Sequence, residues 1–317
     1  MKVLVTGGAG FIGSHIAERL VAEGHEVVIV DDLITGHIEN LALSARFYQM
    51  DLQSPWLDEL FKIEQPQAVV HQAAQASVRR SVHDPVFDAS VNVLGTVGLL
   101  QASVRHGVRR FLFASTGGAL YGDAQVTPTP EDYPTLPVSP YGASKLAAEV
   151  YLRTFHAVHG LSYAALRYAN VYGPRQDPHG EAGVVAIFSR RLLSGETTRI
   201  NGDGKQTRDF VYVGDVADAN VRALASDAIG SFNVGTGIET DINAIFQLLR
   251  ALTGSNQAEV HGPPLPGEQR RSVVDARKIE KVMGWRPRTS LKTGLTATAR
   301  YFREAQAAPA TAPAQPV

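Results

Sequence analysis

The segment Thr6-Gly7-Gly8-Ala9-Gly10-Phe11-Ile12-Gly13 is the strongest local signal for the fold of this chain. It follows an apolar run at residues 2–6 and opens a helical pattern at residues 11–23, so its glycines are spaced G-x-x-G-x-x-G between a strand and a helix. Glycine is needed where the chain turns sharply, where the backbone approaches a pyrophosphate and where a helix packs on a strand. Free N–H groups at a helix start also attract phosphate. The stretch therefore predicts a dinucleotide-binding loop.

An acidic residue follows this loop at the position that the motif requires. Asp31 ends a second apolar run at residues 26–31. A carboxylate there accepts hydrogen bonds from the hydroxyls of the adenosine ribose and repels a 2′-phosphate, which favours NAD over NADP. The alternative interpretation of the glycines is a tight turn that binds no ligand.

Repeated strand and helix patterns surround the loop. Almost continuously apolar runs are typical of strands covered by helices on both faces. They occur at residues 2–6, 26–31, 46–51, 68–73, 110–116 and 162–169. Helix-length segments lie between them, for example residues 11–23 and 85–106. These units predict an α/β fold with a doubly wound parallel sheet of the Rossmann type over residues 1–172.

The pattern changes after residue 172. Short strands are expected at residues 208–213 and 231–234, and helices near residues 184–193, 215–225 and 241–252. We interpret residues 173–305 as a smaller C-terminal α/β substrate lobe, some of whose elements return to the first domain. Residues 306–317 are of low complexity, rich in Ala and Pro, and predict a disordered tail.

Composition limits the classes of function. The chain has 317 residues, of which 44 % are hydrophobic and 19 % charged, and its formal net charge is −1. This balance gives no electrostatic case for nucleic acid or a membrane surface as a partner. A chain without cysteine has no disulfide or thiolate site. Because no secretory leader and no apolar run of ~20 residues is seen, we expect a soluble cytoplasmic protein.

A second motif, Ser139-Pro140-Tyr141-Gly142-Ala143-Ser144-Lys145, is a candidate reactive segment. Ser139 suits a helix N-cap, and Pro140 suits the first helical position. Tyr141 and Lys145 would then share one face of the helix. An ammonium close to a phenol favours the phenolate and lowers the phenol pKa from its usual value of about 10. Such a phenol can take a hydroxyl proton while hydride leaves the same carbon.

A lone Tyr-x-x-x-Lys is common, and its position in the chain is what makes this one informative. The predicted strand before it ends in Ser115-Thr116. These hydroxyls lie at the carboxyl end of a strand, where open α/β sheets bind ligands. A glycine loop, hydroxyls at a strand end and a Tyr-Lys pair, in this order, indicate an active site.

These motifs resemble the extended short-chain dehydrogenase/reductase family, and within it most closely the UDP-glucose 4-epimerases and related UDP-sugar epimerases. The resemblance covers the chain except for the tail, and it implies NAD as the cofactor and a UDP-sugar as the substrate. Further matching segments are Asp51-Leu52, His71-Gln72-Ala73-Ala74, Asn92-Val93-Leu94-Gly95-Thr96, residues 166–175, Asn201-Gly202-Asp203-Gly204 and Thr207-Arg208-Asp209-Phe210-Val211.

The resemblance also implies catalytic roles. Tyr141 would be the base, and Lys145 would activate it and contact a ribose of the cofactor. Thr116 would hydrogen-bond the reacting oxygen of the sugar. The segment after Thr116 is one residue longer than the commoner epimerase pattern, so Ser115 is kept as the alternative for this role.

Binding roles are implied in the same way. Tyr168 would lie near the nicotinamide amide, Asn170 near the sugar phosphate, and Arg208 would clamp the diphosphate with its guanidinium fork. The implied cofactor contacts are Gly7, Gly10, Phe11, Ile12, Gly13, Asp31, Asp32, Asp51, Leu52, Gln72, Ala73, Ala74, Asn92, Tyr141, Lys145 and Tyr168. The implied substrate contacts are Thr116, Asn170, Val184, Arg208, Arg270, Arg271 and Ser272.

Plainer interpretations exist for several of these residues. Arg208 could be a solvent-facing strand residue, and Asn170 could be a turn residue. His71 ends an apolar strand and is interpreted as a structural or cofactor-wall residue, because the phenol already fills the role of the base. The other histidines lack the spacing of metal ligands, and we propose no metal.

The residues after Thr116 indicate which reaction is carried out. Related 4,6-dehydratases have an Asp-Glu pair directly after the reactive Thr, and decarboxylating relatives keep a Glu in that stretch. Here Gly117-Gly118-Ala119-Leu120 follows, and none of its side chains can transfer a proton. This favours simple epimerisation at C4 of a UDP-hexose, UDP-glucose or UDP-galactose, through a transient 4-keto sugar.

The chain departs from the family near residue 265. Epimerases carry an Arg three residues before the acidic member of a Gly-acidic pair, here Gly267-Glu268, and that position is Leu265. Arg270 or Arg271 would have to replace it on the diphosphate. Ser272 lies where the family varies a residue beside the 2-substituent of the sugar. A small serine predicts some activity on UDP-N-acetyl sugars.

Other functions are kept open. The chain could be a 4-epimerase that prefers UDP-GlcNAc/UDP-GalNAc or UDP-glucuronate, which rates on the three donors would decide. A non-catalytic NAD-binding scaffold, or an RNA-binding relative, would be expected to lack Tyr141 or Lys145, and RNA binding also calls for a basic face.

The resemblance finally implies a homodimer in which the helix at residues 85–106 and the helix beginning at residue 140 pair in a four-helix bundle.

Overall fold

The computed structural model describes residues 1–179, 183–265 and 269–307. In these ranges seven strands form one sheet, in the order β11-β6-β5-β4-β1-β2-β3, and every neighbouring pair is parallel. The strands are β1 (Lys2–Thr6), β2 (Glu26–Asp31), β3 (Arg46–Gln49), β4 (Ala68–His71), β5 (Arg110–Thr116), β6 (Ser162–Tyr168) and β11 (Gly230–Val234). The predicted doubly wound parallel sheet is confirmed.

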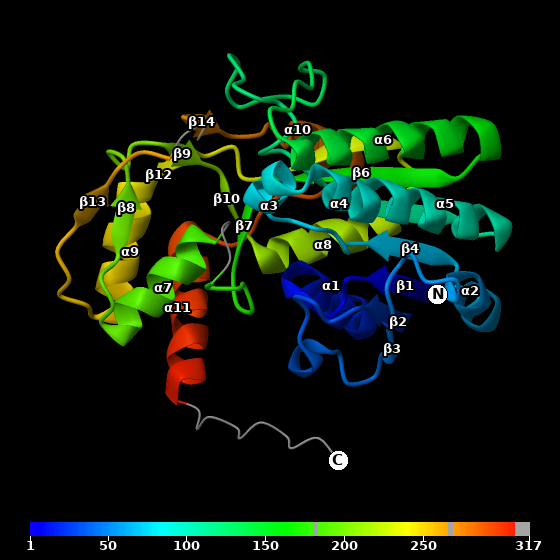
Figure 1. Cartoon of the computed structure of the whole chain (residues 1–317), viewed down its shortest axis with the longest axis horizontal. Helices are drawn as coiled ribbons and strands as arrows, with labels where there is room; N and C mark the ends of the chain where they lie inside the picture. The colour runs from blue at the N-terminus through cyan, green and yellow to red at the C-terminus, as the bar shows by residue number, and fades with distance from the viewer. Residues whose placement is uncertain (180–182, 266–268, 308–317) are drawn as a thin grey trace.

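Helices cover both faces of this sheet, because successive side chains of each buried strand point to opposite faces. One face is covered by α1 (Phe11–Ala22), α8 (Val213–Leu224) and α10 (Arg277–Met283). The other is covered by α2 (Leu57–Glu64), α5 (Gly95–Arg105) and α6 (Pro140–His159). In Figure 1, α5 and α6 lie above β4, and α1 lies below it.

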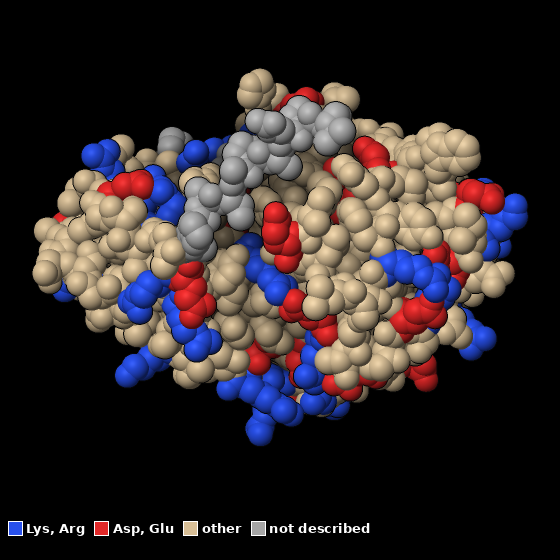
Figure 2. Space-filling view, turned by 90° about the horizontal axis from the view of Figure 1, so that it is seen from below, with Lys and Arg blue, Asp and Glu red and all other residues tan. Residues whose placement is uncertain are grey.

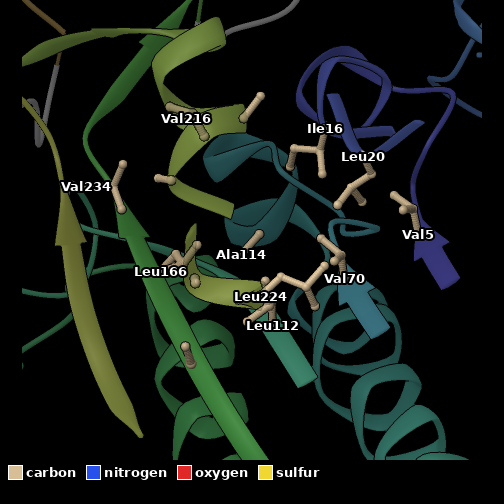
Figure 3. Packing of buried hydrophobic residues seen from close by; sticks show 14 of the residues in the cluster. Val5, Ile16, Leu20, Val70, Leu112, Ala114, Leu166, Val216, Leu224 and Val234 are labelled. Atoms are coloured by element: carbon tan, nitrogen blue, oxygen red, sulfur yellow. The ribbon is translucent and has the colours of Figure 1, made fainter. Parts of the chain in front are cut away.

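The core on the first face joins early and late parts of the chain (Figure 3). Ile16 and Leu20 of α1 lie close to Val70 of β4, and Leu224 of α8 lies over Leu112 of β5. All five side chains are buried. Burial of one such side chain contributes about 1.5–3 kcal/mol, so this layer holds α8 firmly against strands that precede it by more than a hundred residues.

The ends of α6 are set by local sequence. The Ser139 hydroxyl accepts a hydrogen bond from the Gly142 N–H, and Pro140 occupies the first helical turn, as predicted. The helix ends at Gly160, which adopts the left-handed conformation with φ +72° that glycine tolerates best. The reactive segment therefore begins a rigid helix.

The helix predicted at residues 85–106 is interrupted. It consists of α4 (Pro85–Ala89), a π-helical turn η2 (Ser90–Leu94) and α5. The Asp84 carboxylate caps α4 by accepting from the Phe87 N–H at 2.9 Å. A π-turn widens the helix by one residue, and such turns are frequent at functional sites. Two further short helices are η1 (Ile38–Asn40) and α3 (Val78–His83).

The second lobe lies on the left in Figure 1 and has its own core. Three helices form it: α7 (Val184–Ser194), α9 (Ile242–Thr253) and α11 (Leu291–Ala307). Phe188, Phe246 and Leu295 pack together between them. Its short strands are β7 (Asn170–Tyr172), β8 (Arg199–Asn201), β9 (Thr207–Arg208), β10 (Phe210–Tyr212), β12 (Thr240–Asp241), β13 (Val260–Gly262) and β14 (Arg271–Ser272).

Two expectations about the second half need correction. The strand predicted at residues 208–213 is divided into β9 and β10 by Asp209, whose carboxylate turns inward and accepts from the N–H groups of Thr236 and Gly237. The strand near residues 231–234 joins the large sheet as β11 and is thus one of the later elements that return to the first domain, as expected. The helix α11 continues to Ala307, two residues into the expected tail, while residues 308–317 lie outside the described residues.

Charges on the surface are mixed. On the face seen in Figure 2, basic and acidic side chains alternate over short distances. That face therefore has no extended basic field of the kind that draws nucleic acid to a protein. Within the described ranges, no helix combines the length and the apolar character that crossing a membrane requires.

Candidate active site

The glycine loop lies where the strand order reverses. β1 has β2 on one side and β4 on the other, which is the point where open α/β sheets bind ligands. Gly7 has φ +68°, and a Cβ there would lie 2.6 Å from the Ala73 backbone nitrogen. A Cβ on Gly13 would lie 2.0 Å from the Gly7 carbonyl oxygen. Only glycine fits at either place.

The start of α1 fits an anionic group. The N-cap of the helix is Gly10, which offers no side-chain hydrogen bond, and the first turn contains no acidic residue. The N–H groups of this turn, beginning at Phe11 and Ile12, are thus open to phosphate oxygens. These features fit the pyrophosphate of a dinucleotide.

Acidic residues flank this turn at the ends of β2 and β3. Asp31 is buried, and its two carboxylate oxygens accept from the N–H groups of Ala9 and Leu33, each at 2.9 Å. Burial raises the pKa of Asp31 from its ordinary value. Asp32 is exposed and accepts from the Ile34 N–H. Asp51 follows β3 beside Leu52 and accepts from the Gln53 N–H at 2.7 Å.

A chain of hydrogen bonds runs behind the loop through His71. The Ala73 N–H donates to the Thr6 hydroxyl, and Thr6 lies 2.7 Å from His71 Nδ1. The Thr96 hydroxyl donates to the Asn92 carbonyl and lies 2.9 Å from His71 Nε2. The hydroxyl directions assign the ring proton to Nε2. Burial lowers the pKa of His71 to about 3, so the ring is neutral and both nitrogens are engaged.

Tyr141 and Lys145 share one face of α6, as predicted. Lys145 is buried, and its ammonium donates to the Ala114 carbonyl at 3.0 Å. It also lies 4.8 Å from the centroid of the Phe113 ring and 5.9 Å from that of Tyr141. The pair therefore lies at the carboxyl end of β5, on the same edge of the sheet at which the glycine loop follows β1.

The expected acidification of the phenol is not found in this state. Burial, and then the charge of Asp88, raise the pKa of Tyr141 to about 12. Burial lowers the pKa of Lys145 to about 8, against the opposing effect of Asp88. The ammonium makes its hydrogen bond to Ala114, and desolvation outweighs its attraction for a phenolate.

Ser115 and Thr116 face different surroundings. The Ser115 hydroxyl is buried and donates to the Glu149 carboxylate at 2.5 Å, so it is occupied within the protein. Thr116 is half-buried, and its hydroxyl oxygen accepts from the Ala119 N–H at 3.1 Å. The geometry therefore favours Thr116 over Ser115 as the side chain available to a sugar.

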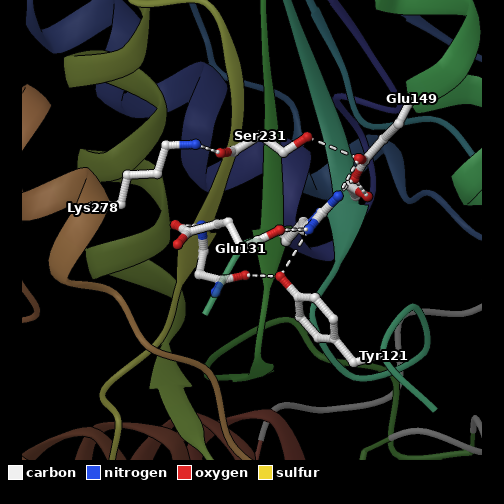
Figure 4. Close-up of polar contacts among 8 residues, drawn as sticks. Tyr121, Glu131, Glu149, Ser231 and Lys278 are labelled. Atoms are coloured by element: carbon white, nitrogen blue, oxygen red, sulfur yellow. Dashed lines mark hydrogen bonds and ion pairs between the residues drawn. The ribbon is translucent and has the colours of Figure 1, made fainter. Parts of the chain in front are cut away.

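A buried ion pair lies behind this segment (Figure 4). Arg167 of β6 holds both carboxylate oxygens of Glu149 at 2.9 and 2.7 Å, and it donates to the Tyr121 hydroxyl at 2.9 Å. Ser231 donates to the second oxygen of Glu149, and Lys278 donates to the Ser231 carbonyl. The cluster links α6, β6, β11 and the segment after β5.

Sequence reasoning did not predict this cluster. Its signal was present, because Glu149 follows Lys145 by one helical turn and Arg167 directly precedes Tyr168. The Glu149 charge and its hydrogen bonds raise the pKa of Arg167 further above its ordinary value, despite burial. Ser115 and Tyr121, on either side of Thr116, are both fixed by this one pair.

Tyr168 lies at the end of β6, close to the loop after β4. Its hydroxyl accepts from Asn220 at 2.8 Å and from Gln72 at 3.1 Å. Burial raises the pKa of Tyr168 to about 12, so it stays a neutral hydrogen-bonding group. Ala73 and Ala74 follow Gln72 and are half-buried at the same edge. The predicted cofactor contacts from β4 and β6 are thus brought together.

Asn92 lies in the π-turn η2 and is buried. Its amide group donates to the Gln75 carbonyl, to Asp88 and to Ser144, and its oxygen accepts from the Gln75 N–H. Asn92 therefore fixes the segment after β4 against α6. Sequence reasoning predicted Asn92 but neither Gln75 nor Asp88.

Two of the predicted substrate residues of the second lobe, Arg208 and Ser272, lie side by side, and Asn170 and Val184 lie on other elements. Ser272 lies opposite Arg208 in the parallel pair β14–β9, and both are half-buried. The Ser272 hydroxyl is 3.7 Å from the point that a Cβ on Gly118 would occupy. Asn170 begins β7, and Val184 begins α7.

The two replacement arginines are engaged elsewhere. Arg270 forms a two-pronged contact with Asp203 at 2.7 and 2.9 Å, and Arg271 forms one with Glu239 at 2.6 and 3.1 Å. Either would have to leave its carboxylate to reach a diphosphate. Leu265 is exposed, and the Gly267-Glu268 pair lies outside the described residues. Among the described residues, no three His, Asp or Glu side chains are grouped as metal ligands.

Comparisons with known proteins agree on one family. A model described as the NAD dependent epimerase/dehydratase family matches residues 3–235. A UDP-glucose 4-epimerase of Mycolicibacterium smegmatis is 47 % identical over 309 residues, which are 96 % of this chain and 99 % of that protein. The crystal structure of a UDP-glucose 4-epimerase from Thermotoga maritima with UDP-glucose has a TM-score of 0.94 at 47 % identity, covering 96 % of this chain and all of that one. A Thermus thermophilus UDP-glucose 4-epimerase in complex with NAD has a TM-score of 0.92 at 46 % identity, with the same coverage.

Proposed function

This chain belongs to the NAD-dependent epimerase/dehydratase family, and we propose that it is an enzyme that epimerises C4 of a UDP-hexose, interconverting UDP-glucose and UDP-galactose. The observation that carries the proposal is the position of Tyr141 and Lys145 at the carboxyl end of β5, which ends in Thr116, on the same edge of the sheet as the glycine loop. The near full-length similarity to UDP-glucose 4-epimerases supports the choice of substrate.

The residues of the chain divide the work of the reaction. NAD⁺, held by the glycine loop at the start of α1 and by Asp31, would supply reversible hydride transfer at C4. Tyr141 takes the proton from the 4-hydroxyl and gives it back, which leaves a 4-keto sugar between the two steps. Thr116 hydrogen-bonds the reacting oxygen, and Lys145 supplies positive charge near the phenol.

The segment after Thr116 limits the chemistry to epimerisation. Elimination of water from C6 needs a further acid and base near the sugar. Gly117 and Gly118 carry no side chain, and Leu120 is buried and apolar. Gly117 cannot be exchanged for a larger residue without a shift, because its Cβ would lie 2.6 Å from the Val274 side chain.

The remaining expectations become part of the proposal. Residues 1–172 form the NAD-binding part, with α8, β11 and α10 added from later in the chain, and residues 173–305 supply the UDP-sugar contacts. Arg208 clamps the diphosphate. We place the protein in the cytoplasm as a homodimer. Exposed apolar side chains on α4, η2 and α6 support the dimer: Val86 (78 % exposed), Leu94 (63 %) and Val158 (67 %).

A wider substrate range is favoured by one observation. Ser272 and Gly118 are close together and both small, so the wall that they form leaves room beside the sugar. If this wall lies next to the 2-substituent, an acetamido group fits there as well as a hydroxyl. We therefore expect some turnover of UDP-GlcNAc in addition to UDP-glucose.

The test is an end-point assay of the purified protein with UDP-glucose, UDP-GlcNAc and UDP-glucuronate, run with and without added NAD. We expect interconversion of UDP-glucose and UDP-galactose, and slower epimerisation of UDP-GlcNAc. Turnover of UDP-glucuronate alone would transfer the assignment to that substrate. No epimerisation of any donor, by a folded protein that binds NAD, would leave only the non-catalytic alternative.

A further inference from the structure

Asp88 of α4 is a buried acidic residue to which the catalytic account gives no role. It is 1 % exposed. One carboxylate oxygen, Oδ1, accepts from Gln75 Nε2 at 2.8 Å and from Asn92 Nδ2 at 3.0 Å. The other oxygen, Oδ2, is buried and has no hydrogen-bond partner within the described part of the chain. An unpaired buried carboxylate oxygen is costly and calls for an explanation.

Hydrogen bonds tie this carboxylate to the reactive helix. The Asn92 amide donates both to Asp88 and to the Ser144 hydroxyl, which is adjacent to Lys145 in the chain. Ser144 in turn donates to the Tyr141 carbonyl at 2.9 Å. α4 and the π-turn pack directly on α6. The free oxygen of Asp88 is therefore held near the Tyr141–Lys145 pair by a fixed frame.

The charged and titratable groups around the Lys145 ammonium are few. Tyr141 lies on the same helix, Asp88 on α4 and His71 on β4. His71 is neutral, because burial lowers its pKa to about 3, and Tyr141 is a neutral phenol in this state. In the described part of the chain, the contacts of the ammonium with β5 are those to the Ala114 carbonyl and the Phe113 ring. Asp88 is thus the one anionic group among these neighbours.

We propose that Asp88 is a positioning residue that acts as the counter-charge of Lys145 and keeps its ammonium protonated in the buried site. The inference rests on the proposed function, because it concerns the pair that performs the reaction. One oxygen of Asp88 has no hydrogen bond because its negative charge acts on Lys145 across the interface between α4 and α6. The attraction between the two charges offsets the cost of burying that oxygen.

The direction of the effect follows from the charges. Burial lowers the pKa of Lys145 to about 8, and the Asp88 charge opposes that decrease. Without the carboxylate, the ammonium would lose its proton at still lower pH. The same charge raises the pKa of Tyr141, so its removal would also let the phenol ionise at lower pH. Both limbs of the pH profile should move together.

The experiment measures the pH dependence of kcat for Asp88→Asn, which keeps the shape of the side chain and removes the charge. We expect both apparent pKa values of the profile to fall by about one unit relative to the wild type. Asp88→Glu, which keeps the charge, should return the limbs to their wild-type positions even if its rate is lower. Asp84→Asn on the same helix is the matched control, because it removes an exposed charge and keeps a capping side chain.

A purely structural role for Asp88 gives a different result. Loss of the hydrogen bonds to Gln75 and Asn92 would lower kcat and the melting temperature and leave the limbs in place, and that outcome would overturn the proposal. Should Asp88→Asn fail to fold, Asp88→Ser removes the same charge and must show the same shift. A wild-type protein without turnover at any pH would refute the proposed function itself, separately from the role of Asp88.

Discussion

At the scale of single residues, His71 shows how a titratable side chain is made inert. Its two nitrogens lie within hydrogen-bond distance of Thr6 and Thr96, and burial lowers its pKa to about 3. The chain of hydrogen bonds joins the strand before the glycine loop to the π-turn that carries Asn92. His71 thus holds the cofactor side of the site in place as a neutral ring.

This has a consequence for stability in acid. An unfolded histidine takes up a proton near pH 6.5, whereas folded His71 does not until about pH 3, so the folded state loses stability as pH falls through this window. At pH 4.5 the loss from this one group is about 3 kcal/mol. In urea unfolding at pH 7 and pH 4.5, His71→Gln should be less stable than the wild type at pH 7 and should show a smaller decrease between the two values.

His159→Gln is the control for this prediction, since it removes an exposed histidine from α6. It should retain the full acid sensitivity of the wild type. An equal decrease for the wild type and His71→Gln would mean that His71 takes up its proton over the same pH range in the folded protein as in the unfolded chain.

Gly13 is the second residue whose role can be tested singly. A Cβ there would lie 2.0 Å from the Gly7 carbonyl oxygen, so Gly13→Ala has to displace either α1 or the loop. We expect loss of NAD binding by at least about tenfold, because the helix start and the loop can no longer face one pyrophosphate together. Equilibrium dialysis or calorimetry with NAD measures it.

Gly98→Ala is the matched substitution, because a Cβ on this helical residue would meet nothing within 4 Å. It should bind NAD normally and gain about 0.5–1 kcal/mol of stability from the better helix former. Normal NAD binding by Gly13→Ala would show that the glycine loop is not part of the cofactor site.

The phenol of Tyr141 marks a limit of sequence reasoning at this scale. The four-residue spacing correctly placed Tyr141 and Lys145 on one helical face. It did not give the pKa, because desolvation and the Asp88 charge come from the packing of α4 and β5 against α6. Proximity in sequence predicts which groups meet, and burial decides which protonation state they hold.

At the scale of elements, the Glu149–Arg167 pair joins α6 to β6 and fixes the ends of the segment that contains Thr116. Both partners are 7 % exposed. Removal of one charge leaves the other buried and uncompensated, which costs about 3–5 kcal/mol. Glu149→Gln should therefore lower the free energy of unfolding by that amount, measured by urea unfolding.

The same variant tests whether the pair positions the reactive segment. Below its melting temperature, Glu149→Gln should keep its NAD content and show a kcat reduced at least about tenfold, because Ser115 and Tyr121 lose their common anchor. Glu196→Gln, which breaks the exposed pair with Arg190, should change neither quantity. Full kcat in a folded Glu149→Gln protein would reduce the cluster to a purely structural feature.

Element boundaries show where local pattern and tertiary contact diverge. The cap and first turn of α6 followed from Ser139 and Pro140 alone. The division of the helix at residues 85–106 did not, because the π-turn is stabilised by Asn92 bonding to Gln75 from another part of the chain. Likewise, Asp209 divides a strand by turning toward a loop almost thirty residues later.

At the scale of the whole molecule, the sheet is completed by late segments of the chain. β11 adds to the edge of β6, and α8 covers the strands beside α1. The parallel, doubly wound architecture could be predicted because apolar runs and the glycine loop are local signals. The sequence did not indicate that β11 is the strand that returns to the large sheet, since only Phe232 and Val234 of its five residues have apolar side chains and so short a pattern fits either lobe. The family resemblance is confirmed by the comparisons.

The proposed dimer is a prediction at this scale. Val86, Leu94 and Val158 are more than half exposed on neighbouring helices of one side. A double substitution, Leu94→Asp with Val158→Asp, should convert a dimer into a monomer of 34.1 kDa by placing charges in the buried centre of the interface. Light scattering coupled to size exclusion measures the mass.

Leu43→Asp, at a fully exposed position in a loop, is the control and should stay dimeric. A wild-type protein that is monomeric at micromolar concentration would contradict the proposed assembly. The mass measurement tests the assembly separately from the reaction, since neither Leu94 nor Val158 has a proposed role in catalysis.

The decisive experiment for the whole molecule is the interconversion of UDP-glucose and UDP-galactose by Tyr141→Phe. The claim is that one phenol oxygen carries the proton of the 4-hydroxyl. Tyr141→Phe should fold, bind NAD and lose at least about a hundredfold in kcat. Tyr151→Phe, on the exposed face of the same helix, should retain wild-type activity. A Tyr141→Phe protein that turns over at the wild-type rate would contradict the account.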